Sequence, residues 1–161
     1  MFLLASISGL LFAPGFAGIL LGLGIFAALN IWTRFSIPKG IYTFESRGVG
    51  SFEPTIARYA RLVEVILGLT TGSIALLAGT SFFHSLSKLP PTYANPLALL
   101  AMSILGLVLF IGLLTFFYEE WQHRSDQYTQ TRYRLVVQLG FTGLLCFALG
   151  YAWLAYVLVR G

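Results

Sequence analysis

Of the 161 residues, 57% are hydrophobic and only 10% are charged, against roughly 25% charged residues in an average soluble domain. A soluble fold of this length could not hide so much apolar surface, so the composition excludes a soluble globular domain and favours a single membrane domain over residues 1–161. The net charge of +4 comes from basic residues beside the apolar segments. This pattern is typical of orientation signals and lipid headgroup contacts rather than of nucleic-acid binding.

Four apolar segments follow one another along the chain. Each is long enough for the roughly 20 residues that an α-helix needs to cross a hydrocarbon core about 30 Å thick. Inside lipid every backbone amide must be hydrogen-bonded within its own segment, so we expect all four segments to be helices. The sequence therefore predicts an all-α, multi-pass integral membrane protein, a four-transmembrane-helix bundle. The expected spans are residues 1–33, 62–83, 96–118 and 135–159.

The first apolar segment is too long for one perpendicular span and contains Pro14 and Gly15. Proline removes a backbone donor and crowds the preceding turn, so a break is expected there. Residues 1–12 either cross the membrane in a kinked helix or lie at the interface before a span over 16–33. The segment lacks a preceding basic region and exceeds the apolar core of a signal peptide, so we expect it to be retained, although Ala27-Ala28 leaves cleavage open.

Basic residues are distributed unevenly between the loops. The first loop holds five Lys or Arg and the third holds three, whereas the second loop and the C-terminus share two. The positive-inside rule then predicts both termini on the non-cytoplasmic side and a long inner loop between helices 1 and 2. The third loop lacks glycine and proline, so the last two helices are expected to extend into a hairpin near Ser125, with Glu120 paired to Arg124.

Small residues recur at three- or four-residue spacing along the first two spans. They include Gly18 and Gly22 in the first span and Gly68, Gly72 and Gly79 in the second. Such spacing lets helix backbones approach closely. The sequence leaves open whether these faces make a specific contact with another subunit or pack within the bundle.

Several polar side chains fall inside the spans. Thr70, Thr71 and Ser73 are expected to bond back to carbonyl groups of the preceding helical turn, as hydroxyls in membrane helices often do. Gln138 and Thr142, four residues apart in the last span, are better candidates for an interhelical hydrogen bond.

Glu64 is the one acidic residue expected at or inside a span boundary, where burying an unpaired ionisable group is costly. Arg61 precedes it by three residues on the same side of the helix, so we expect a partly solvated ion pair at the inner membrane interface. The alternative is a carboxylate that binds a ligand or handles protons.

Two further residues are candidates for ligand contacts. Arg47, before Gly48 and Gly50, could bind a phosphate or a lipid headgroup, with a flexible hinge as the alternative. His84 could be an axial ligand for a tetrapyrrole of a larger complex, with a surface histidine as the alternative. The other histidine, His123, is expected on the opposite membrane side, which excludes a haem held by two histidines of one chain. No catalytic group, metal site or resident cofactor is predicted.

In size, in its four spans and in its long basic first inner loop, the chain resembles the membrane-associated eicosanoid and glutathione metabolism family of trimeric glutathione-using enzymes. That family carries an Arg, an Asn and a Glu at the inner end of its second span. Here Arg58, Arg61 and Glu64 stand in that stretch, with the first arginine shifted and no Asn. The resemblance implies that Glu64 and the inner arginines would bind glutathione.

Three classes of function follow. The preferred one is a non-catalytic accessory, assembly or stabilising subunit of a larger membrane complex, in contact with lipids and with other integral membrane subunits or further copies of itself. A homo-oligomeric glutathione-using enzyme is the alternative, and a small oligomeric channel or transporter is the third. The preference rests on spans with hardly any ionisable groups, which suit packing and offer few groups for chemistry.

Overall fold

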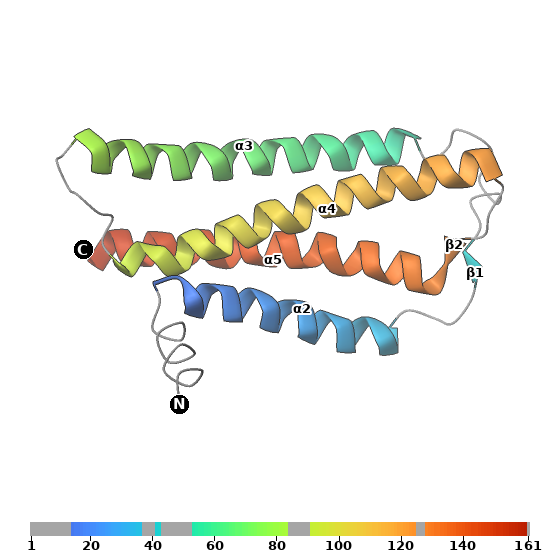
Figure 1. Ribbon diagram of the computed structural model, residues 1–161, viewed down its shortest axis with the longest axis horizontal. Coiled ribbons are helices and arrows are strands. Elements are labelled where there is room, and N and C mark those ends of the chain that lie inside the picture. The colour runs from blue at the N-terminus through green and yellow to red at the C-terminus, as the bar shows by residue number, and fades with distance from the viewer. Residues whose placement is uncertain (1–13, 37–40, 43–52, 84–90, 125–127, 161) are drawn as a thin grey trace, which may run out of the picture.

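A computed structural model describes residues 14–36, 41–42, 53–83, 91–124 and 128–160. This part of the chain is built from four long α-helices (Figure 1). They are α2 (Phe16–Ser36), α3 (Glu53–Phe83), α4 (Ala94–Arg124) and α5 (Gln130–Arg160). Each is long and apolar enough to cross a membrane, which confirms the all-helical class with four candidate membrane spans.

The break predicted at Pro14 is present, because Pro14 and Gly15 form a turn and α2 begins at the next residue. Gly15 has a φ of 93°, a left-handed conformation that glycine adopts without steric cost. The backbone N–H of Gly18, in the first turn of α2, donates to Oδ1 of Asn95 (3.3 Å). A side chain of α4 thus satisfies one of the amides that the start of a helix leaves open. Residues 1–12 lie outside the described part of the chain.

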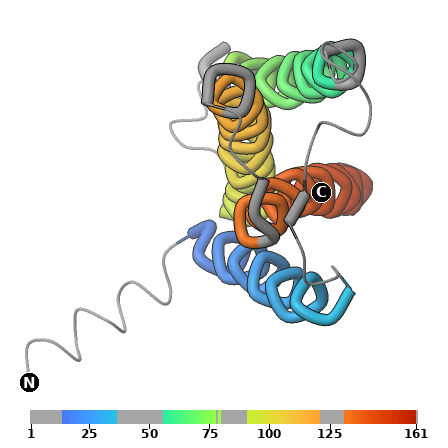
Figure 2. Tube along the Cα trace, turned by 90° about the vertical axis from the view of Figure 1, so that its right-hand side faces the viewer, coloured from blue at the N-terminus to red at the C-terminus, as the bar shows by residue number. Residues whose placement is uncertain are grey.

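The helices run up and down, so that α2 begins, α3 ends, α4 begins and α5 ends at the same end of the bundle (Figure 1). The two central helices are α4 and α5, and α2 packs against both of them. On the far side α4 crosses obliquely towards α3, which makes its main contacts with α4 (Figure 2). One side of α3 is therefore turned away from the rest of the bundle.

Glycines bring α4 and α5 into close contact. A Cβ atom on Gly106 would lie 3.2 Å from the Cα of Gly143, and one on Gly143 would lie 2.7 Å from Cγ of Leu107. Leu107 also packs against Val63 and Ile66, so the buried core of the molecule joins α3 to the central pair. This is the small-residue packing that helices use in lipid, where van der Waals contact rather than water exclusion holds them together.

At the end of the bundle where α2 ends and α5 begins, two short strands connect the loops. In β1 (Ile41–Tyr42) and β2 (Tyr128–Thr129) the residues pair antiparallel. The helical extension predicted for α4 is present, and Glu120 forms an ion pair with Arg132 of α5 (3.2 Å), which links the two helices. The side chain of Arg124, which the sequence predicts to pair with Glu120, lies outside the described part of the structure.

Candidate functional site: the outer face of helix α3

The glycines predicted to support helix packing fall into two groups. In the first group, Gly18 and Gly22 face α4, where a Cβ on Gly22 would lie 3.3 Å from Cγ of Met102. Gln138 makes an interhelical hydrogen bond, with its Nε2 donating to Oγ1 of Thr33 on α2 (2.8 Å), whereas the hydroxyl of Thr142, the other candidate, is buried and forms no hydrogen bond. These residues therefore hold the chain together.

The second group, Gly68, Gly72 and Gly79 of α3, does not pack within the chain. Among the described residues, nothing lies within 4 Å of a Cβ built on any of these three glycines. Of the two interpretations that the sequence leaves open, packing inside the bundle has no contact to support it here, because α3 contacts α4 through the opposite side of the helix. That side carries the buried Val63 and Ile66.

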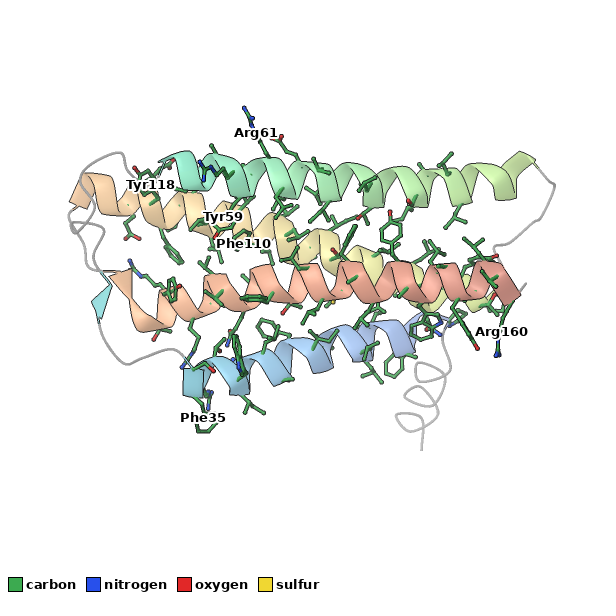
Figure 3. The ribbon with its side chains drawn as sticks, turned by 180° about the vertical axis from the view of Figure 1, so that it is seen from behind. Phe35, Tyr59, Arg61, Phe110, Tyr118 and Arg160 are labelled. Carbon is green, nitrogen blue, oxygen red and sulfur yellow. The ribbon has the colours of Figure 1, made fainter. Side chains whose placement is uncertain are left out.

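Arg61 and Glu64 lie on the same side of α3 as these glycines. Residues spaced by three, four or seven share one face of a helix, and the positions 61, 64, 68, 72 and 79 follow that spacing. Both charged residues are exposed, and Arg61 points away from the bundle (Figure 3). The expected ion pair between them is not formed, since the two side chains do not come within the 4.0 Å of a salt bridge; the ion pair seen between described residues is Arg132–Glu120.

Glu64 lies at the depth of the middle of α4. Val63 and Ile66, on either side of it, pack in one buried cluster with Leu107, which is the central residue of the apolar segment 96–118. Tyr59, nearer the start of α3, stacks edge-on against Phe110 with ring centroids 5.8 Å apart (Figure 3).

The sequence predicts Glu64 at or inside a span boundary. The candidate span of α3 begins at Ile56, and Glu64 lies eight residues inside it. A charged side chain at the centre of a membrane helix costs about 2.5–3.5 kcal/mol on insertion scales, unless it finds a partner. The outer face of α3 thus combines an exposed acid, an exposed base and a line of small residues within a candidate membrane span.

Three hydroxyl side chains in the middle of α3 form hydrogen bonds. Thr70 donates to the carbonyl of Ile66 (2.7 Å) and Thr71 to that of Leu67 (2.6 Å), as predicted. Ser73 departs from that prediction. Its Oγ lies 2.6 Å from the hydroxyl of Tyr151, and this hydroxyl donates to the carbonyl of Leu69 (2.8 Å).

Tyr151 is therefore a residue whose role sequence reasoning missed. Because its own proton is donated to the Leu69 carbonyl, Tyr151 accepts its bond from Ser73. It ties α5 to α3 at two points. Its position one turn after Phe147, whose ring lies 4.8 Å away, is the signal that could have placed it on an inward face.

The remaining predicted site residues are not brought together. Arg58 is exposed on α3, while Arg47 and His84 lie outside the described residues. Cys146 is buried. In the described part of the chain, no group of three or more His, Cys, Asp or Glu side chains is placed to hold a metal ion.

The chain matches no known family model, no curated protein and no solved structure.

Proposed function

We propose that this chain is a non-catalytic subunit of a larger membrane assembly, in which it has an accessory or stabilising role and is joined through the outer face of α3. The observation that supports this is the position of Glu64 and Arg61, exposed and apart, level with the buried core. Lipid offers such groups no partner, whereas another protein subunit does. Beside them, Gly68 and Gly72 leave room for a second helix to approach closely.

The polar groups inside the bundle also favour packing over transport or chemistry. Thr33 is hydrogen-bonded to Gln138, and Ser73 is hydrogen-bonded to Tyr151. These bonds join helices to each other, which is a structural use of polar side chains in lipid. A transport path would instead be expected to present several polar groups to a shared opening.

A leucine substitution at Gly68 tests this assembly role. The Gly68→Leu variant is expected to fold normally, because none of the described residues lies near a Cβ at this site, and to lose its partner when extracted gently from the native membrane. The measurement is the mass of the intact complex after capture of the tagged chain. Gly24→Leu is the matched control, since Gly24 of α2 is equally open and lies on a different helix.

Two results would contradict the proposal. One is a complex that stays intact in the Gly68→Leu variant, which would show that the outer face of α3 is not the subunit contact. The other is a homo-oligomer that binds glutathione and loses this binding on replacement of Arg61 or Glu64, which would favour the enzyme.

We further propose that both termini lie outside the cytoplasm, from the excess of Lys and Arg in the first and third loops. Cysteines placed at Ser36 and Thr92, which are exposed near opposite ends of the bundle, test this orientation in a Cys146→Ala background. In intact cells, a membrane-impermeant thiol reagent should label the cysteine at position 92 and spare the one at position 36. The reverse pattern would invert the topology.

A further inference from the structure

We infer that the partner on the outer face of α3 is a second copy of this chain, related by a two-fold axis along the membrane normal, with Arg61 of each copy paired to Glu64 of the other. The inference rests on the proposed function only in taking this face as a subunit contact. It goes further by naming the occupant and the bonds that hold it.

The charges of this face identify the occupant. At the level of the buried core it carries one base, Arg61, and one acid, Glu64, which do not pair with each other within the chain, while Arg58 lies one turn nearer the start of α3. A foreign helix would have to supply an acid and a base at matching depths. A second copy carries that matching pair already. In a two-fold interface, a contact between Arg61 of one copy and Glu64 of the other is repeated with the two copies exchanged. At that level the interface then pairs two acids with two bases.

The geometry of the membrane suits this pairing. Two copies inserted in the same orientation place their α3 helices parallel, so equivalent residues lie at equal depth. Arg61 and Glu64 are three residues apart, which is about 4.5 Å along a helix axis. An arginine side chain spans that offset, and its guanidinium can bind a carboxylate through two parallel hydrogen bonds.

The glycines allow the two helices to come close enough for these bonds. Gly68 follows Glu64 by four residues on the same face, and Gly72 follows by four more. Both have open space where a Cβ would stand. Small residues at this spacing let parallel backbones touch, and close packing on one side of the ion pairs keeps lipid away from them.

Charge reversal with two differently tagged copies tests the inference. Chains with Arg61→Glu or Glu64→Arg should each pair poorly with themselves, because like charges then meet. When the two variants are co-expressed, they should pair with each other at least about tenfold better than either pairs with itself, as close charge pairs across interfaces do. The double variant R61E/E64R should regain self-pairing. Arg34→Glu, a reversal of an exposed charge on α2, is the control and should have no effect.

Disulfide formation between two copies tests whether the two-fold axis lies beside the outer face of α3. In a Cys146→Ala background, Gly68→Cys should give a cross-linked dimer of the full chain under mild oxidation, while Gly24→Cys on α2 should not. Each variant is first required to retain the unfolding midpoint of the wild-type chain, which is expected because these side chains face away from the bundle.

The outcomes separate this inference from the proposed function. Tagged copies that pair regardless of charge reversal would overturn the inference. So would copies that never pair while a different membrane protein is bound at fixed stoichiometry, a result that would leave the proposed function standing. A chain that is monomeric in its native membrane would overturn both.

Discussion

Replacing Gly18 with alanine is expected to separate α2 from α4 and to lower the stability of the chain by about 1–3 kcal/mol, the usual cost of forcing extra atoms into a packed contact. The new Cβ would meet the carbonyl oxygen of Asn95 at a separation that real Cβ atoms do not show. This neighbour is backbone in the first turn of α4 and cannot rotate aside. The same shift would also break the bond from the Gly18 amide to the Asn95 side chain.

The measurement is equilibrium unfolding of the purified chain in mixed micelles, followed by tryptophan fluorescence. Trp32 of α2 reports on the release of α2 from the bundle, because its ring packs edge-on against Phe141 of α5 at 6.1 Å between centroids. Gly24→Ala is the control on the same helix, since nothing lies near a Cβ there among the described residues. Equal stability of the two variants would show that α2 does not pack on α4 through Gly18.

The second large effect is expected for Leu107→Ala. Leu107 is 2% exposed and touches both the buried side of α3 and Gly143 of α5. Removing its side chain leaves a cavity shared by three helices, and such truncations cost about 2–5 kcal/mol in water-soluble cores. The lower end of that range is expected here, because in lipid the packing contribution acts without the transfer of apolar surface from water.

Leu105→Ala provides the matched control, because Leu105 is 53% exposed on the outer side of the same helix. Its loss should change the unfolding free energy little. Protease digestion adds a second readout, since α3 is held mainly by α4 and should become the first helix to be cut in Leu107→Ala. If both variants unfolded alike, the cluster of Leu107 with Val63 and Ile66 would not be what anchors α3.

The sequence was sufficient for the features that depend on local chemistry. The length and apolarity of the segments predicted four spanning helices, since lipid leaves backbone amides no other partner. Pro14 predicted the start of α2, and the hydroxyls of Thr70 and Thr71 predicted their own backbone bonds. The interhelical bond of Gln138 was also foreseeable, because an amide in lipid must find a partner.

The tertiary structure decided which faces meet and how deep each helix lies. Gly18 and Gly68 look alike in the sequence, yet one packs against α4 and the other faces outwards. The spans are apolar on every side, so their periodicity does not distinguish the lipid-facing side from the packed side, as it does for a helix at the surface of a soluble protein. Depth is equally undetermined for a helix such as α3, which is longer than the hydrocarbon is thick. Packing against Leu107 fixes the position of α3 within the bundle, and Val63 and Ile66 thereby bring the neighbouring Glu64 to the level of the buried core.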